Sequence, residues 1–493
     1  MLREVDPEVV SRTNPFVKLV KGQRIVEVPE LELESGVVLR NFPIAYKTWG
    51  HLNERGDNCL VICHALTGSS DVSDWWGPLL GSDLGFDPSR FFIVCLNSMG
   101  SPYGSFSPLT VNEETGRPYG PEFPLCTVRD DVRAHKIVLD SLNVKSVACV
   151  IGGSMGGMVA LEWAAMYGHG PNRFVKNLVA LATSARHSAW CISWSEAQRQ
   201  AIYSDPKYLD GYYSLEEPPL TGLSAARMSA LLTYRSRNSF ENKFSRRKPS
   251  LEQTQKSGHH STSHIDSPGS IPTSVSEQSL RIHNDGYRTK STNTQRPELG
   301  KNGRAGSIAS DVSSSESIKS ASSVTSISSA TGEAKDVKPA QTYFSAQSYL
   351  RYQGTKFVQR FDANCYIAIT RKLDTHDLGR DRPEYDDDIE SVLEDIKIPS
   401  LVIGIKSDGL FTYSEQEFLA EYLPNSRLEK IESPEGHDAF LLEFKLINRL
   451  ILEFLQSNAN EITSAPPIEW KGEIGQDEQA GSVFGEAEEV TNW

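Results

Sequence analysis

The sequence predicts an α/β fold in which a mostly parallel β-sheet is flanked by helices. Short, continuous apolar runs recur in the first 185 residues and again after residue 398, a pattern typical of strands buried on both faces. Helix-period segments alternate with these runs, as the crossover connections of a parallel sheet require. One run ends in a glycine-rich turn, GGSMGG, and a helical pattern follows at once.

The expected strands can be placed in chain order. A crossover helix is predicted at residues 128–142, between the strands expected at 91–97 and 147–151. Val132, Leu139 and Leu142 recur there at helical spacing. A final amphipathic helix is expected near residues 439–455. The strands themselves are expected at residues 58–66, 91–97, 147–151, 178–182, 399–408 and 428–432.

Composition divides the chain further. From residue 248 to 339, Ser, Thr, Gln, Lys and Gly dominate, so this segment buries too little apolar surface to offset the entropy of ordering and is expected to be disordered. His259, His260 and His264 in this tract are interpreted as solvated side chains rather than metal ligands. We therefore expect a core at 1–185 and 386–456, a helical cap at 186–247 and 340–385, the disordered insertion at 248–339, and a tail at 457–493.

Charge, hydropathy and cysteine content restrict the possible partners. With 64 acidic and 50 basic residues the formal charge is −14, which gives no electrostatic reason to expect nucleic acid. No apolar run approaches the length of a membrane span, and the acidic start, MLREVDPEVV, lacks the apolar centre of a signal peptide. The seven cysteines show no paired metal-site spacing, so buried free thiols in a cytoplasmic protein are expected.

The turn at residues 152–156, Gly-Gly-Ser-Met-Gly, fits the G-x-S-x-G nucleophile elbow. Such an elbow needs a strand before it and a helix after it, and both are predicted here. The glycines leave room for a strained turn that lifts Ser154 Oγ clear of the sheet. Ser154 is therefore predicted to be a nucleophile, and the amide of Met155 is placed to bind an acyl oxygen.

A serine needs a base before it becomes a good nucleophile. In α/β-hydrolases the partners follow in the order serine, acid, histidine. Asp408 ends the strand-like run LVIGIKSD, and His437 lies in the loop after the last expected strand, so these two are predicted as acid and base. His135 and His187 are weaker candidates for the base. Asp386, Asp387 and Asp388 are interpreted as a solvated linker.

An oxyanion hole needs a second backbone N–H from the loop after an early strand. That strand is expected to be LVIC, and the loop that follows it is His64-Ala65-Leu66-Thr67-Gly68. Leu66 is the predicted second donor, together with Met155. His64 is predicted to hold the loop in place through a hydrogen bond.

With these residues in place, the sequence resembles the homoserine O-acetyltransferases of the α/β-hydrolase superfamily, and specifically their fungal type. Segments that carry the resemblance include CHALTGS, NSMGSPYGSFSP, GGSMGGM, SAARMSALLTYRSRNSFENKF and EGHDAF, in family order along the ordered chain. The resemblance implies Ser154, Asp408 and His437 as the triad, Arg227 as a contact for the substrate carboxylate and Asp438 as a contact for its amine. It also implies a homodimer without a metal or bound prosthetic group.

The resemblance implies transfer of an acetyl group from acetyl-CoA, a co-substrate, to L-homoserine, giving O-acetyl-L-homoserine in methionine biosynthesis. Three alternatives stay open. The same chemistry with serine as acceptor or succinyl-CoA as donor is decided by a few pocket side chains. An esterase or thioesterase shares every catalytic residue, although Arg227 and Asp438 suit an amino acid. A silent scaffold with a partner-binding serine-rich loop is disfavoured by the intact triad.

Overall fold

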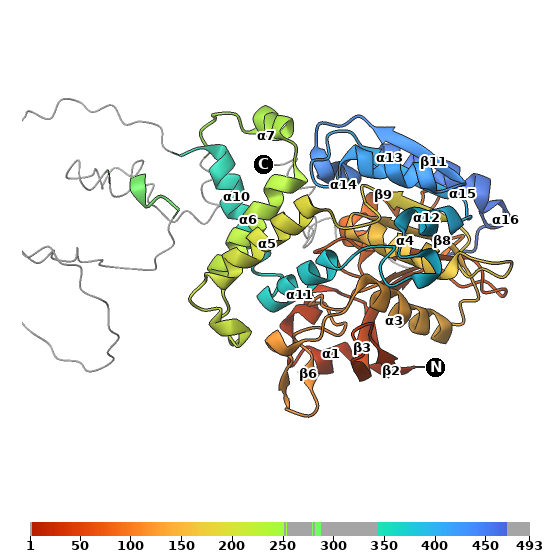
Figure 1. Cartoon of the computed structure of the whole chain (residues 1–493), viewed down its shortest axis with the longest axis horizontal. Coiled ribbons are helices and arrows are strands. Elements are labelled where there is room, and N and C mark those ends of the chain that lie inside the picture. The colour runs from red at the N-terminus through yellow and green to blue at the C-terminus, as the bar shows by residue number, and fades with distance from the viewer. Residues whose placement is uncertain (1, 251–252, 254–278, 280–281, 287–342, 471–493) are drawn as a thin grey trace, which may run out of the picture. The chain divides into compact units, whose positions relative to one another are not determined.

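The computed structural model describes residues 2–250, 253, 279, 282–286 and 343–470 (Figure 1). Most of the predicted insertion at 248–339 lies outside these residues, including His259, His260 and His264. Of the tail predicted at 457–493, residues 471–493 also lie outside them. Within the described part of the chain, no helix combines the length and the apolar character needed to cross a membrane. All seven cysteines are buried and free.

The centre of the fold is a nine-stranded sheet in the order β1-β2-β3-β5-β4-β8-β9-β10-β11. From β5 to β11 each neighbouring pair is parallel, whereas β1, β2 and β3 join antiparallel at one edge. A separate antiparallel pair is formed by β6 and β7. The strands are β1 Arg3–Val5, β2 Arg24–Glu32, β3 Val38–Trp49, β4 Cys59–Cys63, β5 Phe92–Leu96, β6 Val111–Asn112, β7 Arg117–Pro118, β8 Val147–Gly153, β9 Leu178–Leu181, β10 Ser400–Ile405 and β11 Ser426–Ile431.

The predicted strands all overlap strands of the parallel part of the sheet, and the mostly parallel α/β architecture is confirmed. The antiparallel edge was not predicted. Apolar and polar residues are interspersed along β2 and β3, and buried positions alternate irregularly with exposed ones, so neither strand is a continuous apolar run. Antiparallel strands with one solvated face have this pattern.

Both faces of the parallel strands are buried. In β4, Val61 packs into one apolar cluster and Leu60 and Ile62 into another, because successive side chains point to opposite sides of a strand. The first cluster contains apolar side chains of α3, α4, α12 and α13, and the second contains those of α15. Helices therefore cover the sheet on both faces.

The predicted crossover helix is confirmed as α3, Val128–Ser141, and a capping box of Thr127 and Asp130 closes its first turn. The final amphipathic helix expected near residues 439–455 is confirmed as α15, but the chain breaks at Glu443 and leaves residues 439–442 as a separate helix, α14. The helices are α1 Pro7–Val10, α2 Val72–Trp75, α3 Val128–Ser141, α4 Met155–Tyr167, α5 Ala189–Tyr203, α6 Leu220–Tyr234, α7 Arg237–Lys243, α10 Ser345–Phe357, α11 Ala363–Asp374, α12 Ile389–Asp395, α13 Tyr413–Tyr422, α14 Ala439–Leu442, α15 Phe444–Asn458 and α16 Asn460–Thr463.

Short 3₁₀ turns connect several of these elements. They are η1 Pro15–Leu19, η2 Gly77–Leu79, η3 Gly120–Glu122, η4 Leu209–Gly211, η5 Pro383–Tyr385 and η6 Gly436–Asp438. The turn η6 matters for the site, because it follows β11 and leads directly into α14.

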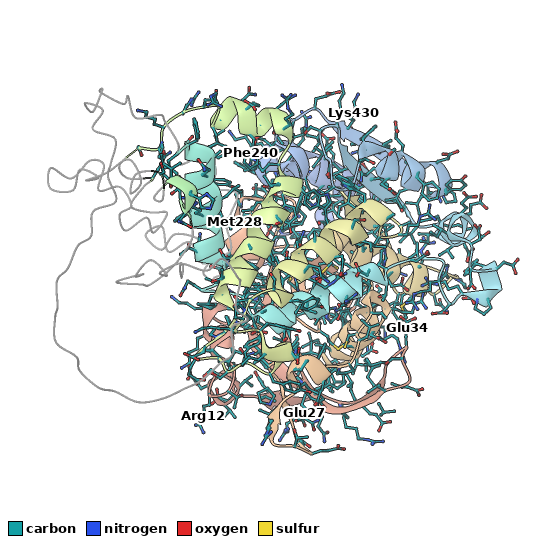
Figure 2. The ribbon with its side chains drawn as sticks, turned by 60° about the vertical axis from the view of Figure 1, so that its left-hand side comes forward. Arg12, Glu27, Glu34, Met228, Phe240 and Lys430 are labelled. Atoms are coloured by element: carbon teal, nitrogen blue, oxygen red, sulfur yellow. The ribbon has the colours of Figure 1, made fainter. Side chains whose placement is uncertain are left out.

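A group of helices lies outside the two layers that cover the sheet. We call α5, α6, α7, α10 and α11 the cap helices; α6 packs against α5 and α10, and α11 packs against α5 (Figure 1). Met228 of α6 and Phe240 of α7 mark two of them in Figure 2. The apolar cluster of α5, α6, α10 and α11 also contains Met155 and Met158 of α4, so these four helices rest on the elbow turn.

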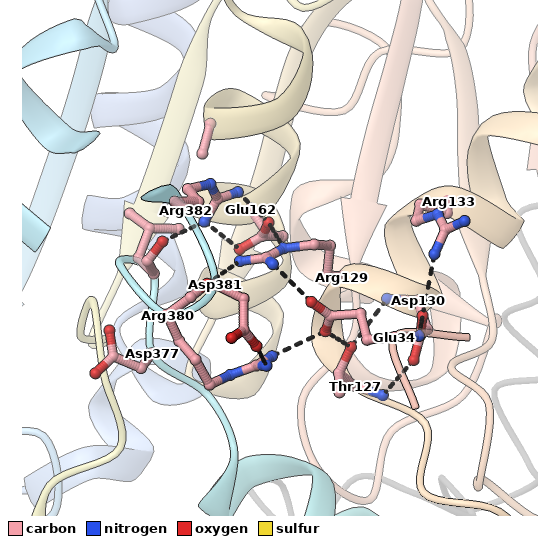
Figure 3. A network of polar contacts seen from close by, with 12 residues as sticks. Glu34, Thr127, Arg129, Asp130, Arg133, Glu162, Asp377, Arg380, Asp381 and Arg382 are labelled. Carbon is pink, nitrogen blue, oxygen red and sulfur yellow. Dashed lines mark hydrogen bonds and ion pairs between the residues drawn. The ribbon is translucent and has the colours of Figure 1, made fainter. Parts of the chain in front are cut away.

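A largely buried ionic network ties the antiparallel edge to the helices (Figure 3). Arg129 of α3 bonds to Glu34 at 2.6 Å and to Glu162 of α4 at 2.9 Å. Arg380, in the loop after α11, reaches Glu34 at 2.8 Å, and Arg382 in the same loop pairs with Glu162. The network thus joins four segments that are far apart in sequence, and Glu162 lies at its centre with 2% of its side chain exposed.

Substituting Glu162 by Gln should lower the free energy of unfolding by about 3 kcal/mol, because it leaves the buried guanidinium of Arg382 without its carboxylate partner and leaves Arg129 with Glu34 alone. Denaturant unfolding measures this loss. Glu30→Gln is the matched control: its partner Arg40 lies 2.9 Å away, but both side chains are more than half exposed, so the expected loss is under ~1 kcal/mol. Equal losses in the two variants would contradict the role given to the network.

Candidate active site

Ser154 occupies a sharp turn between β8 and α4. Its backbone has φ 59° and ψ −128°, a conformation that L-residues rarely adopt. A Cβ on Gly152 would lie 2.0 Å from the carbonyl oxygen of Gly156, and one on Gly156 would lie 2.1 Å from that of Cys63. Only glycine fits at these two positions, so the G-x-S-x-G pattern here reflects close backbone packing around a strained serine.

The serine is joined to the predicted base and acid. His437 Nε2 lies 2.8 Å from Ser154 Oγ, and His437 Nδ1 lies 2.7 Å from Asp408 Oδ2. The second carboxylate oxygen of Asp408 accepts hydrogen bonds from the amides of Leu410 and Phe411. With Nδ1–H donating to the carboxylate, Nε2 is the acceptor for the serine hydroxyl proton.

The electrostatics favour a histidine that takes up a proton readily. Burial lowers the pKa of His437, but the charge and hydrogen bond of Asp408, together with the charge of Asp438, outweigh it and raise the pKa above its ordinary 6.5. The rings of Phe411 and Phe440 have centroids 5.4 and 5.2 Å from the imidazole. These rings shield the hydrogen-bonded chain from water, which strengthens its electrostatic interactions.

The predicted oxyanion residues lie on two adjacent segments. Met155 is the first residue of α4, where backbone N–H groups have no acceptor within the helix. Leu66 is half-buried in the loop after β4 and packs on the apolar cluster that contains Met155. The close approach of Gly156 to Cys63 places the start of α4 against the end of β4. The two residues are therefore brought to the same end of the sheet.

His64 has the structural role predicted for it. Its Nδ1 donates to the carbonyl of Ala65 at 2.8 Å, and its Nε2 accepts from the amide of Ser98 at 2.9 Å. Burial lowers the pKa of His64 to about 4, so the ring is neutral at pH 7, as the acceptor role requires. A cap residue that the sequence did not point to, Arg360, donates to the carbonyl of Thr67 at 3.1 Å.

The two predicted substrate contacts lie beside the base. Arg227 of α6 is 1% exposed, with its guanidinium carbon 5.2 Å from the ring of Tyr234, which lies 6.0 Å from the His437 ring. Asp438 follows His437 directly. Burial raises the pKa of Asp438 to about 6, against the opposing charges of Arg235, His437 and Arg227. A buried cation and a half-buried carboxylate therefore flank the base, a charge pattern complementary to an amino-acid zwitterion.

The remaining sequence candidates lie elsewhere. His135 is buried in α3, where Nε2 lies 3.4 Å from the carbonyl of Asn97. His187 precedes α5, and its backbone N–H donates to the carbonyl of His376. Asp388 caps α12. Tyr234, Arg235 and Arg360 were missed, although Tyr234 ends α6 about two helical turns after Arg227 and Arg235 follows it directly.

Comparisons with known proteins find similar sequences and similar folds. Residues 58–275 match the alpha/beta hydrolase fold family. The chain is 73% identical to a homoserine O-acetyltransferase of Saccharomyces cerevisiae, covering 100% of this chain and 98% of that protein, and 51% identical to one of Schizosaccharomyces pombe, covering 98% and 96%.

Two solved structures share the fold. A homoserine O-acetyltransferase from Bacillus anthracis superposes with a TM-score of 0.64 at 19% identity, covering 88% of this chain and 97% of that one. Esterase E22 superposes with a TM-score of 0.63 at 21% identity, covering 88% and 99%. At these identities the likeness concerns the fold alone.

A fluorophosphonate reagent, which reacts with activated serines, should label Ser154 at a rate that falls as the pH is lowered. His437 must be unprotonated to accept the serine proton, so the midpoint should lie above pH 6.5. Mass spectrometry of the labelled peptide measures the rate. Asp408→Asn should slow labelling on the order of 10³-fold or more by removing the acceptor that fixes the histidine tautomer. Labelling that is independent of pH, or that falls on another serine, would contradict this arrangement.

Proposed function

The chain belongs to the homoserine O-acetyltransferase family of the alpha/beta hydrolase fold, and from that premise we propose that it transfers the acetyl group of acetyl-CoA to the hydroxyl of L-homoserine. The products are O-acetyl-L-homoserine and CoA, a step of methionine biosynthesis. The observation that carries the proposal is the hydrogen-bonded chain Ser154–His437–Asp408 next to Arg227 and Asp438. The first set supplies acyl-transfer chemistry, and the second suits an amino-acid acceptor.

The first half-reaction acetylates the enzyme. Ser154 Oγ attacks the thioester carbonyl while His437 Nε2 takes its proton, and the amides of Leu66 and Met155 hold the oxyanion. When the tetrahedral intermediate collapses, the carbon–sulfur bond breaks. The departing CoA thiolate takes the proton from His437, which leaves acetyl-Ser154 and a neutral imidazole.

The second half-reaction transfers the acetyl group. The hydroxyl of homoserine gives its proton to His437 and attacks the acetyl-Ser154 carbonyl; the carbon–oxygen bond to Ser154 then breaks, and the serine recovers its proton from His437. Arg227 binds the substrate carboxylate through a two-pronged contact, and Asp438 binds the ammonium group. The proposed reaction uses acetyl-CoA as a co-substrate and no metal or bound prosthetic group.

Water must be kept from the acetyl-serine for transfer to win over hydrolysis. Ser154 is 8% exposed and His437 3% exposed. The cap helices supply this cover, since α6 packs against η6 and the side chains of α5, α6, α10 and α11 join those of Met155 and Met158. This enclosure favours an acyltransferase over an esterase with the same catalytic residues.

The proposal extends to the compartment and the oligomeric state of the enzyme. We place the enzyme in the cytoplasm and expect it to act as a homodimer. Large apolar side chains stand exposed on the paired helices α5 and α6, which is the kind of surface that a second copy covers. They are Trp190, Ile192, Leu220 and Leu232.

Purified protein assayed with homoserine or serine as acceptor, and acetyl-CoA or succinyl-CoA as donor, should turn over homoserine with acetyl-CoA best. Ser154→Ala should keep its thermal unfolding profile and lose turnover on the order of 10⁴-fold or more, because only binding and oxyanion contacts remain. Preference for serine or succinyl-CoA would change the substrate assignment. CoA release that is indifferent to any acceptor would favour a thioesterase.

Arg227→Lys should reduce kcat/KM for homoserine by roughly 30-fold, equivalent to about 2 kcal/mol, because a lysine cannot reproduce the two-pronged contact. Acetyl-enzyme formation, followed as CoA release without acceptor, should change little. Arg371→Lys, on the half-exposed face of α11, is the matched control and should leave both half-reactions unaltered. Equal losses in both half-reactions with Arg227→Lys would assign this arginine to the fold or to the thioester site.

A further inference from the structure

The end of α6 is fastened to the loop that carries the base. Arg235 pairs with Glu435 and donates to Ser239 Oγ at 2.5 Å, and Ser239 Oγ in turn donates to Glu435 at 2.8 Å. Ser236 Oγ donates to the carbonyl of Pro434. A Cβ on Gly436 would lie 2.4 Å from the amide nitrogen of Ser236, so the two backbones are in direct contact. Residues 235–239 and 434–438 therefore form one packed unit.

Arg235 has a second arm that points toward Asp438. Its Nη1 lies 4.0 Å from Asp438 Oδ2, and the arginine as a whole is 7% exposed. This Nη1 is buried and forms no hydrogen bond with any residue that the structure describes. One buried guanidinium is thus shared between Glu435, which it contacts directly, and Asp438, which it faces across a slightly longer gap.

Asp438 lies among several ionisable groups. From α6 it is faced by Arg227 and Tyr234, from the loop after β10 by Asp408, and from its own turn by His437. Lys243 of α7 interacts electrostatically with Arg235 and Glu435. Because its pKa is about 6, Asp438 changes from ionised to neutral as the pH falls from 8 to 5.

We propose that Arg235, shared between Glu435 and Asp438, is a positioning residue that keeps Asp438 ionised and so able to hold the ammonium group of homoserine. This inference rests on the proposed function. The charge of Arg235 opposes the cost of burying a carboxylate, whereas Glu435 draws that charge away. Removing Arg235 and removing the charge of Glu435 should therefore shift the ionisation of Asp438 in opposite directions.

The direction of the pH dependence of homoserine affinity is set by the protonation state of Asp438 that binds. The ionised carboxylate binds the ammonium group, so affinity for homoserine is present above the pKa of Asp438 and lost as the pH falls through it. Without Arg235 the pKa rises, and affinity is lost at a higher pH. Without the charge of Glu435 the pKa falls, and affinity persists to a lower pH. A purely structural role for Arg235 would lower affinity at every pH and leave the midpoint in place.

The test measures homoserine binding by calorimetry from about pH 5 to pH 8 in Ser154→Ala protein, which cannot turn over. Added Arg235→Met should move the midpoint of affinity loss upward by about one pH unit, and added Glu435→Gln should move it downward. Arg235→Lys keeps the positive charge, so its midpoint should stay close to that of the protein with Arg235 intact. If Arg235→Met fails to fold, the downward shift in Glu435→Gln decides alone.

Two controls isolate Asp438. Binding of 4-hydroxybutyrate, which lacks the ammonium group, should not weaken as the pH falls, so an effect of His437 protonation on the pocket as a whole is separated from one on Asp438. Arg427→Met removes an arginine that pairs with Glu429 on the exposed side of β11 and should leave the midpoint unchanged. Midpoints that fail to move apart in Arg235→Met and Glu435→Gln would overturn the inference.

Asp438→Asn distinguishes this inference from the proposed function. If homoserine affinity is unchanged in that variant, the ammonium contact itself is wrong. If affinity is lost there while the Arg235 and Glu435 variants keep the original midpoint, the ammonium contact stands and the role of Arg235 is wrong.

Discussion

The site depends on a backbone constraint at Ser154. Contacts with neighbouring segments hold the turn between β8 and α4 in its strained conformation. Gly156 packs directly against the end of β4, and the Thr183 hydroxyl donates to the Ser154 carbonyl at 2.7 Å. Parallel strands end at one edge of their sheet, which is where open α/β sheets place ligands. Asp408 lies in the loop after β10 and His437 in the loop after β11, so both side chains are at the same edge of the sheet as Ser154.

The cap helices do more than cover this edge. One helix, α6, presents Arg227 to the site and ends in Tyr234 and Arg235, which meet the turn η6 that carries His437 and Asp438. The base and the proposed ammonium contact are adjacent residues, so each charge affects the other. The cap segment after α10 also touches the loop after β4 through Arg360. In the proposed function, binding of the acceptor and chemistry at the serine therefore depend on neighbouring charged residues.

Local pattern was enough to predict the parallel strands, the crossover helix α3, and the serine, acid and histidine, because each follows a recognisable strand. It was not enough for β2 and β3, whose irregular polar positions hide them from a search for continuous apolar runs, or for the break at Glu443. The roles of Tyr234, Arg235 and Arg360 depend on contacts across more than a hundred residues or between the cap and the core, which spacing along the chain does not encode.

In the proposed mechanism the acetyl group passes through Ser154. Mixing the enzyme with acetyl-CoA and no acceptor tests it most directly. We expect one rapid equivalent of CoA per active site and a single acetyl group, located on Ser154 by peptide mass spectrometry. Release of CoA only when homoserine is present, or an acetyl group on another side chain, would contradict it.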